Sequence, residues 1–228
     1  MNKIKFASPS GNKDIIPVPA KTQVPDWYKN AERFIGGKLE VKNKFGNHGL
    51  KLCVPFLDAL TAGYTARLWT DVHIIKDNKG RTSITWEDNI DPILRRETVN
   101  KTIPIPIGCS NQHMAWSYSF HMQLPKGYSA ILTHPINRYD LPFMTLTGFV
   151  DADYTQPRGE YPFFIKEDFE GVIEKGTPIF QIIPFKRENW SMQIDDSIIE
   201  VGLKNEFLTG KHLFGWYKKN KWKKKIYE

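Results

Sequence analysis

Short stretches in which hydrophobic and polar residues alternate dominate the chain from Leu50 onward. The clearest runs from Ala66 to Ile74, and it is followed by the turn Asp77-Asn78-Lys79-Gly80 and a returning stretch from Arg81 to Trp86. Alternation with a period of two is typical of a strand with one buried face, and a short turn that ends in glycine predicts a hairpin.

Further stretches of the same character predict short strands at Met114 to Leu124, Ser129 to Thr133, Phe143 to Val150, Tyr161 to Ile165 and Pro178 to Phe185. Turns at Pro125-Lys126-Gly127 and Glu174-Lys175-Gly176 separate some of them. Helical periodicity is weak, and only Val24 to Arg33 and Asp91 to Glu97 are expected to be helical. The pattern predicts a mainly β sandwich or barrel-like fold.

Prolines mark the N-terminal region, at positions 9, 17, 19 and 25, and Trp27-Tyr28 follows them. Because proline fixes φ and removes a backbone donor, we expect an extended arm with polyproline character. The aromatic pair is expected to anchor this arm to the body or to a neighbouring subunit, since an uncovered Trp-Tyr pair is costly in water. The alternative is that the pair binds a ligand.

Composition restricts the class of protein. Of the 228 residues, 40% are hydrophobic, which is enough to build a sizeable core. The hydrophobic runs are too short to span a bilayer, and the first residues do not resemble a secretory signal, so we expect no membrane association and a location in the cytoplasm of a host or in a virion. The only cysteines, Cys53 and Cys109, are expected to be reduced thiols.

The formal net charge of +7 comes mostly from one end of the chain. Residues 211–228 hold seven lysines and one acidic residue, interleaved with Phe214, Trp216, Tyr217 and Trp222. Aromatic faces stack bases and lysines neutralise phosphates, so this segment is a candidate for binding single-stranded nucleic acid. Docking on an acidic neighbouring subunit and simple solvation are the alternatives. We therefore expect an arm at residues 1–49, a β domain at 50–210 and a basic aromatic tail at 211–228.

Four segments, in order, resemble motifs of one known superfamily. They are Thr61 to Leu68 with its Gly63-Tyr64 pair, Leu124 to Tyr128, Gly148 to Tyr154 followed by Arg158-Gly159-Glu160, and Glu174 to Ile183 with Gln181. Together they resemble the deoxyuridine triphosphatase (dUTPase) and dCTP deaminase superfamily, which has the β-clip fold. The resemblance implies a β-clip domain. The overall pattern of the sequence also resembles that of phage-borne proteins.

The sequence also departs from the family pattern. Thr65 stands where family enzymes have an aspartate, and residues 133–138 replace an Arg-Ser pair that holds phosphates. Residues 155–157 are an insertion, and the glycine-rich fifth motif is missing unless Phe214-Gly215 is its remnant. These changes weaken the expectation of catalysis more than the expectation of the fold.

The resemblance implies roles for particular residues. Asp151 would activate a water molecule for attack on the α-phosphate, and Tyr154 would pack against deoxyribose. Gln181 and Tyr64 match motif positions, and we expect both to bind nucleotide. Arg138 and Arg158, with His134 as a further candidate, would replace the missing phosphate donors.

The function implied is binding of a deoxynucleotide by a homotrimer whose sites lie between subunits, with hydrolysis of dUTP to dUMP and pyrophosphate as the further step. Magnesium would be bound through the nucleotide phosphates.

The residues also allow a different interpretation. Asp151 and Asp153 can be turn residues, Tyr154 can be an edge aromatic, and Gln181 can serve only to satisfy buried backbone groups. The chain would then be a non-catalytic β-clip protein used in viral assembly, capsid decoration or partner binding. Cys109, His113 and His121 do not match a common zinc-ligand spacing, so no protein-bound metal is expected.

Overall fold

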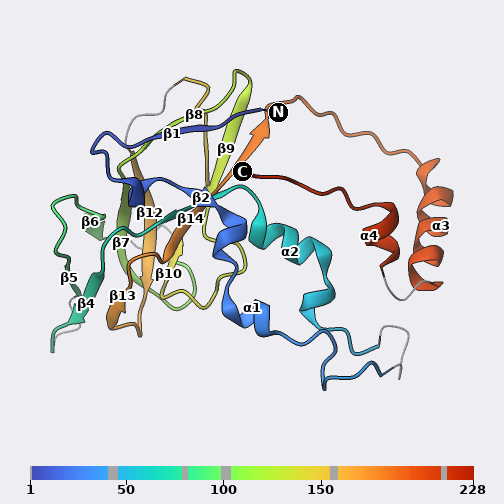
Figure 1. The fold of residues 1–228 in the computed structure, drawn as a ribbon, viewed down its shortest axis with the longest axis horizontal. Coiled ribbons are helices and arrows are strands. Elements are labelled where there is room, and N and C mark those ends of the chain that lie inside the picture. Colours follow the sequence, from blue (N-terminus) through green and yellow to red (C-terminus); the bar gives the residue numbers. More distant parts are fainter. Residues whose placement is uncertain (1, 41–45, 79–81, 99–103, 155–158, 212–214) are drawn as a thin grey trace. The chain divides into compact units, whose positions relative to one another are not determined.

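The computed structural model describes residues 2–40, 46–78, 82–98, 104–154, 159–211 and 215–228 (Figure 1). Contacts between residues divide the chain into two compact units. The first unit contains Met1–Gln23, Leu60–Arg187 and Tyr227, and the second contains Val24–Ala59, Glu188–Ile226 and Glu228. The three-part division expected at 49/50 and 210/211 stays a prediction.

Antiparallel strands make up most of the first unit. The five-stranded sheet has the order β11 (Gly148–Val150), β9 (Tyr128–Thr133), β14 (Pro178–Lys186), β3 (Tyr64–Arg67) and β2 (Val18–Pro19). The four-stranded sheet has the order β10 (Phe143–Thr145), β12 (Gly159–Lys166), β7 (Cys109–Tyr118) and β6 (Ile93–Thr98). Two smaller sheets pair β13 (Gly171–Ile173), β4 (Val72–Lys76) and β5 (Thr82–Thr85), and β1 (Lys5–Ala7) with β8 (His121–Gln123). The predicted mainly β class is confirmed, and none of these described sheets closes into a barrel.

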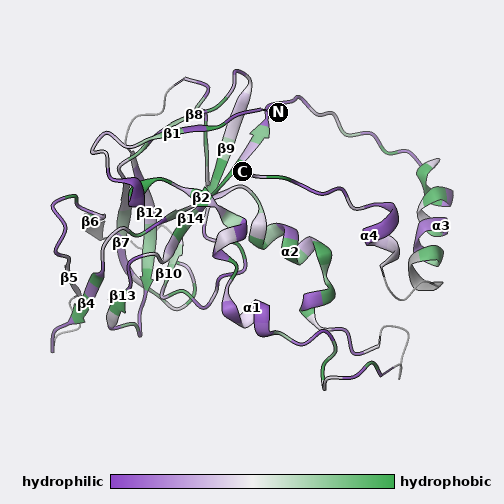
Figure 2. Cartoon of the chain, in the orientation of Figure 1, coloured by the Kyte–Doolittle hydropathy of each residue, from purple (hydrophilic) through white to green (hydrophobic). Residues whose placement is uncertain are grey.

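Helices are short and lie mostly in the second unit. They are α1 (Asp26–Asn30), α2 (Val54–Thr61), α3 (Ile198–Lys211) and α4 (Trp216–Asn220), with 3-10 turns η1 (Lys13–Ile15), η2 (Ala20–Gln23) and η3 (Leu50–Leu52). Figure 2 shows hydrophobic and hydrophilic residues interleaved along α3, so this helix has no sharply separated apolar face.

Aromatic side chains form the centre of the core between the two larger sheets. The Trp116 and Phe163 rings stack with centroids 3.6 Å apart, and the edge of Phe143 meets Trp116 at 4.9 Å. From the five-stranded sheet, Phe180 lies 5.5 Å from Tyr161. Burial raises the pKa of Tyr161 to about 12, and its hydroxyl donates to the Leu132 carbonyl at 2.6 Å. The phenol therefore stays neutral and links the two sheets.

Thr145 is a buried polar residue within this apolar core. Its hydroxyl accepts a hydrogen bond from Trp116 Nε1 at 3.0 Å and donates one to the Ile179 carbonyl at 2.7 Å. Both partners lie in the core, so one hydroxyl satisfies two groups that have no access to water.

Several predicted strands are confirmed. Ser129 to Thr133, Tyr161 to Ile165 and Pro178 to Phe185 fall within β9, β12 and β14. The predicted hairpin is confirmed by the pairing of β4 with β5, while residues 79–81 of its turn and return lie outside the described residues.

Other predictions were wrong in detail, because tertiary pairing divides the alternating stretches. The run from Ala66 to Ile74 forms two strands, since the Leu68 N–H donates to the Thr177 carbonyl and the chain leaves the five-stranded sheet there. The stretch from Phe143 to Val150 likewise crosses from one sheet to another, as strands do at the corners of sandwiches.

Two further corrections concern the length and type of elements. The predicted strand at Met114 to Leu124 becomes β7 and β8, which lie in different sheets. The helix predicted at Asp91 to Glu97 is strand β6, because pairing with β7 buries Ile93 and overrides a weak local preference.

The N-terminal region follows the body of the first unit through β1 and β2, which pair with β8 and β3. In the second unit, Tyr28 is buried and stacks on Phe56 of α2 with ring centroids 5.9 Å apart. Trp27 meets the same ring edge-on at 6.3 Å. The aromatic pair therefore docks on the chain itself.

Thr145→Val tests the buried polar link. Valine keeps the shape of threonine but leaves the Trp116 indole N–H and the Ile179 carbonyl without this partner. We expect urea denaturation to report a loss of about 2–4 kcal/mol in the free energy of unfolding. Thr85→Val, at an exposed position of β5, is the matched control and should change it by less than about 0.5 kcal/mol. Equal effects of both substitutions would contradict this account.

Candidate functional site

The pairing of three strands creates the candidate site at one edge of the five-stranded sheet. Because β9 runs antiparallel to both β11 and β14, the beginning of β9 meets the ends of the other two. The register pairs Val150 with Ala130 and Lys186 with Tyr128. The residues just beyond these pairs, Asp151 and Arg187, therefore lie beside the start of β9.

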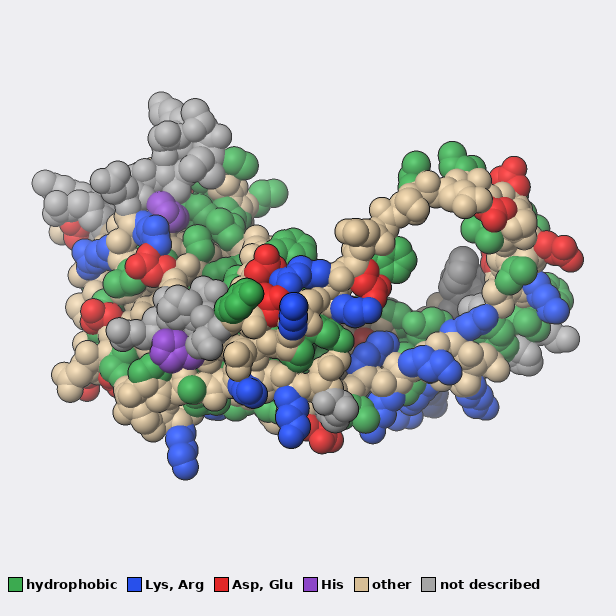
Figure 3. Space-filling model, turned by 90° about the horizontal axis from the view of Figure 1, so that it is seen from above, with side chains coloured by type: hydrophobic (Ala, Val, Ile, Leu, Met, Phe, Trp, Pro, Cys, Tyr) green, Lys and Arg blue, Asp and Glu red, His purple; other side chains and the backbone are tan. Residues whose placement is uncertain are grey.

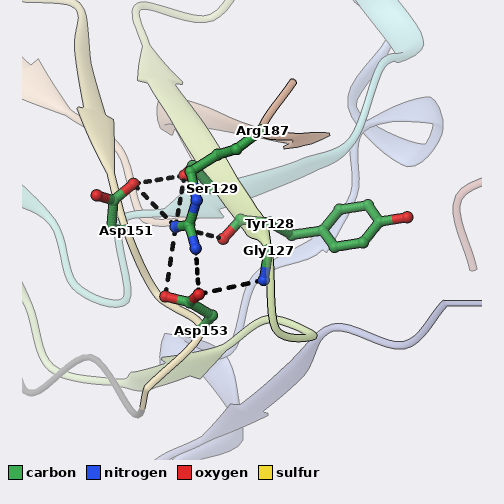
Figure 4. A network of polar contacts seen from close by, with 6 residues as sticks. All are labelled: Gly127, Tyr128, Ser129, Asp151, Asp153 and Arg187. Atoms are coloured by element: carbon green, nitrogen blue, oxygen red, sulfur yellow. Dashed lines mark hydrogen bonds and ion pairs between the residues drawn. The ribbon is translucent and has the colours of Figure 1, made fainter. Parts of the chain in front are cut away.

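A polar network joins these strand ends (Figure 4). The Ser129 hydroxyl donates to Asp151 Oδ1 at 2.5 Å, and Arg187 Nη1 lies 3.3 Å from the same oxygen. Arg187 Nη2 forms an ion pair with Asp153, and the Gly127 N–H donates to Asp153 Oδ2 at 3.2 Å. One guanidinium thus holds two carboxylates, and these two carboxylates have different environments.

The Asp153 side chain is only 11% exposed, whereas that of Asp151 is 72% exposed. Arg187 and the Gly127 N–H hold the pKa of Asp153 below its ordinary value, and Asp153 in turn raises the pKa of Arg187. Asp153 is therefore an ionised structural group. Asp151 has one oxygen held in place and a carboxylate that faces solvent, the arrangement that a general base needs.

The sequence analysis predicted Asp151 as a site residue and did not point to Arg187. Arg187 lies 36 positions away in the chain from Asp151, and only the register of β9 brings them together. Spacing along the sequence contains no signal for this contact.

Tyr154 follows the network and is highly exposed, so it is available to a ligand and is not packed as an edge aromatic. Arg158 and the insertion at 155–157 lie outside the described residues.

The remaining predicted residues lie toward the other end of the sheet. Gln181 is buried, and its Nε2 donates to the Ala62 carbonyl at 2.5 Å while its Oε1 accepts from the Ile136 N–H at 3.0 Å. Its contacts are therefore those of a residue that satisfies buried backbone groups.

Arg138 lies near Gln181. Its Nε and Nη2 atoms each donate a hydrogen bond to the Asp140 carboxylate at 2.9 Å. Arg138 and Gln181 line a hollow of about 10 Å³, which is room for one water molecule. Gln181 pairs with Thr133, four residues from Ser129 along β9, so this end of the sheet is about 13 Å from Asp151 along the strand. Within one chain, Arg138 and Gln181 therefore lie apart from Asp151.

Tyr64 begins β3 and pairs with Ile182. The Phe6 ring lies 5.5 Å from the Tyr64 ring and the Tyr227 ring lies 6.2 Å from it, both edge-on. Gly63 before it has φ of +67°, and a Cβ there would lie 2.0 Å from the Ile182 carbonyl oxygen. Glycine is thus required for the turn and for the close approach of β14. Thr65, which stands where family enzymes have an aspartate, is buried.

His134 fixes the loop that holds Arg138. The Thr145 N–H donates to His134 Nδ1 at 3.3 Å, so the proton lies on Nε2, which donates to the Arg138 carbonyl at 2.9 Å. Burial lowers the pKa of His134 below its ordinary value of 6.5. His134 is therefore a neutral structural residue, not a phosphate donor in this conformation.

The lysine-rich segment makes contacts within its own unit. Trp222 Nε1 donates to Asp58 Oδ2 at 2.8 Å, and Lys225 Nζ lies 2.5 Å from the same oxygen. Lys221 lies over the Trp216 ring and Lys225 over the Trp222 ring. Figure 3 shows Lys and Arg side chains gathered over this segment. The two tryptophan rings thus have lysine partners within the segment, and the prediction of nucleic-acid binding gains no support.

Within the described residues, no group of three or more His, Cys, Asp or Glu side chains is arranged to hold a metal ion. Cys53 is exposed and Cys109 is buried, and both are free thiols. In the described part of the chain, no helix combines the length and apolar character needed to cross a bilayer.

No protein-family model matches the sequence, and no curated protein sequence matches it. Among solved structures, the chain is similar to a Y84I mutant of the Staphylococcus bacteriophage 80alpha dUTPase, with 14% identity, 86% of this chain and 97% of that chain covered, and a TM-score of 0.36. It is also similar to the Agrobacterium tumefaciens 2'-deoxycytidine 5'-triphosphate deaminase, with 13% identity, 82% of this chain and 52% of that chain covered, and a TM-score of 0.36. At these identities and TM-scores, neither a family nor a residue role of this chain follows from the likeness.

His134→Gln tests the protonation state of the buried histidine. The folded-state pKa is lowered, so the unfolded chain takes up the proton first as the pH falls below about 6.5, and folding becomes less stable. We expect the wild type to lose stability between pH 6.5 and 5 relative to pH 8. Glutamine can make both hydrogen bonds without titrating, so the variant should lose less over the same range. Chemical denaturation of both proteins at each pH measures the difference, and parallel pH profiles would contradict this assignment.

Proposed function

We propose that the chain binds a deoxynucleoside triphosphate at the Asp151 hairpin and hydrolyses it to the monophosphate and pyrophosphate, with dUTP as the substrate that the sequence resemblance implies. The observation that carries this proposal is the exposed Asp151 carboxylate, one oxygen of which is held by Ser129 and Arg187. Tyr154, also exposed, is three residues away and suited to pack against a sugar.

In the proposed reaction, Asp151 accepts a proton from a water molecule as the water oxygen bonds to the α-phosphorus. The bond from that phosphorus to the bridging oxygen breaks, and pyrophosphate leaves with the electron pair. Arg187 keeps the Asp151 oxygen oriented while Asp153 fixes Arg187 in turn. Proton transfer to a positioned base is typically worth about 10²–10⁴ in rate.

A magnesium ion fits this site only as part of the nucleotide complex. The described residues offer no cluster of ligands for a resident ion, whereas Mg²⁺ usually binds substrate phosphates and keeps most of its waters. It would offset the charge on the phosphates, and the exposed Asp151 would contact its water shell.

The separation within one chain supports a site that a second copy completes. Asp151 and Tyr154 lie at one end of the sheet, and Gln181, Arg138 and Tyr64 lie toward the other. In the proposed homotrimer, the Asp151 hairpin of one subunit faces the Arg138 end of the next, with Arg158 as a further phosphate donor. The Arg138 guanidinium has five N–H donors, and it donates to Asp140 from Nε and Nη2. The other donors would contact a phosphate in the proposed site.

A non-catalytic role in assembly, such as capsid decoration, is the second candidate. It is favoured by the use of the Gln181 amide for backbone groups and by the hollow of about 10 Å³ beside it. In this case the motif residues stabilise the fold and bind no nucleotide.

Asp151→Asn distinguishes the two candidates. Asparagine preserves the shape but cannot accept the proton, so we expect pyrophosphate release from dUTP with Mg²⁺ to fall at least about 100-fold. The increase in melting temperature on adding dUTP should remain. Asp168→Asn, at an exposed carboxylate outside the network, is the control and should keep full activity. No dUTP-dependent rise in melting temperature and no turnover by the wild type would favour the assembly role.

Mixing two inactive variants tests the shared site. Asp151→Asn and Arg138→Gln each remove one half of the proposed site. If the halves come from different subunits, unfolding and refolding the variants together should restore about a quarter of wild-type activity, because that fraction of sites combines two intact halves. A mixture as inactive as its components would show that a single chain must provide both residues.

A further inference from the structure

A hollow of about 420 Å³ lies beside β13 in the first unit. Val172 and Ile173 of β13 line it together with Phe169 and with residues 140–142, the segment that leads into β10. Its volume is within the range of about 300–1,000 Å³ that is typical of ligand pockets. None of the residues in the Asp151 network lines it. The hollow is therefore a separate candidate for binding.

The position of the hollow relative to β13 follows from the geometry of a strand. Successive side chains of a strand point to opposite faces of the sheet, and here Val172 is 43% exposed while Ile173 is buried. A hollow that contacts both side chains therefore lies beside the strand and not over one of its faces. One edge of β13 pairs with β4 in antiparallel register, so the hollow lies at the other edge.

This outer edge of β13 has unpaired backbone groups. β13 is the terminal strand of its sheet, and among the described residues no strand other than β4 pairs with it. No backbone hydrogen bond from another described segment reaches Gly171, Val172 or Ile173 either. Because the N–H and C=O groups of a strand point to both of its edges, an edge strand is a template for the pairing of a further strand. The hollow provides space for such a strand.

The hollow also has an excess of acidic side chains. Three carboxylates and one lysine line it. Arg138 pairs with Asp140, and the Lys166 ammonium group donates to the Tyr139 carbonyl at 2.7 Å. Glu174, which follows β13, is exposed and has no ion-pair partner in the described part of the chain. A polyanion such as nucleic acid would be repelled here, whereas a cationic side chain would gain a partner.

We propose that an extended segment of a partner protein, with basic residues at alternate positions, pairs with the outer edge of β13 in this hollow. Main-chain hydrogen bonds along the edge supply the affinity, and the side chains select the sequence. β13 has three residues, so the paired stretch is about 10 Å long.

The alternation of a strand decides which residues the partner presents. In the proposed contact, apolar side chains on one face of the added strand pack on Leu141 and Phe169, and basic side chains on its other face reach Glu174. The class of sequence recognised is therefore an alternation of basic and apolar residues. The contact uses neither a nucleotide nor Asp151, so it holds whether or not the chain is an enzyme.

A fluorescein-labelled hexapeptide of alternating lysine and valine tests the proposal. We expect its fluorescence anisotropy to rise when the wild-type protein is added, and the binding to weaken as salt is added. The same peptide with every backbone nitrogen methylated keeps its charge but cannot donate to β13, and it should bind at least about tenfold more weakly. A hexapeptide of alternating glutamate and valine should not bind. Equal binding of the methylated peptide, or no binding of the unmodified one at millimolar concentration, would overturn the proposal.

Glu174→Gln removes one carboxylate charge and keeps the size of the side chain. Binding of the lysine–valine peptide should weaken about three- to fivefold, the effect of losing one exposed ion pair. Glu174→Lys should weaken it further and permit the glutamate–valine peptide to bind. The matched control, Glu87→Gln, changes an exposed carboxylate that does not line the hollow and should leave binding unchanged. Equal effects of Glu174→Gln and Glu87→Gln would place the peptide elsewhere and contradict the proposal.

Hydrogen exchange shows where the peptide lies. Strand pairing should slow the exchange of backbone amides within β13 when the peptide is added, in the wild type and in Asp151→Asn alike. Protection confined to other segments would overturn the proposal. Loss of self-association in Glu174→Lys, without peptide binding by the wild type, would identify a second copy as the occupant and overturn it as well. Pyrophosphate release is measured separately, so absence of peptide binding and absence of catalysis give different results.

Discussion

The pairing of β9 with β11 on one side and β14 on the other is the constraint on which the rest of the structure depends. Its register sets which residues meet at each end of the five-stranded sheet. At the end that contains Ser129, the carboxylates of the hairpin meet Arg187. At the end that contains Thr133, the same strands place Gln181 against buried backbone groups. A shift by one residue would exchange the two faces of β9 and remove both arrangements together.

Sequence reasoning was most successful where local pattern and tertiary environment agree. The strands β9, β12 and β14 are apolar, lie between turns and are paired on both sides, so their short apolar stretches were sufficient to predict them. It was least successful where pairing decides the outcome. Residues 91–97 have a mixed pattern that a helix could also satisfy, and only the presence of β7 makes them a strand. A signal for α3 does exist, because Ser197 and Glu200 have the spacing of a capping box.

The candidate site illustrates the same limit. Asp151 could be found because a motif marks it, yet the motif says nothing about which oxygen is held or by what. Arg187 supplies that information, and it could not be found without the fold. Gln181 presents the opposite case, since its place in a motif suggests a ligand contact while its amide serves the Ala62 carbonyl and the Ile136 N–H. A motif position and a chemical role are therefore separate properties in this protein.

Gly63 shows what this separation means for evolution. The absence of a side chain there lets the carbonyl of Ile182 approach the turn before Tyr64, and the positive φ also excludes most other residues. A lineage that lost all activity would still be unable to replace this glycine without moving β14. The packing of two strands is consequently enough to require Gly63, whether the chain is an enzyme or a purely structural protein.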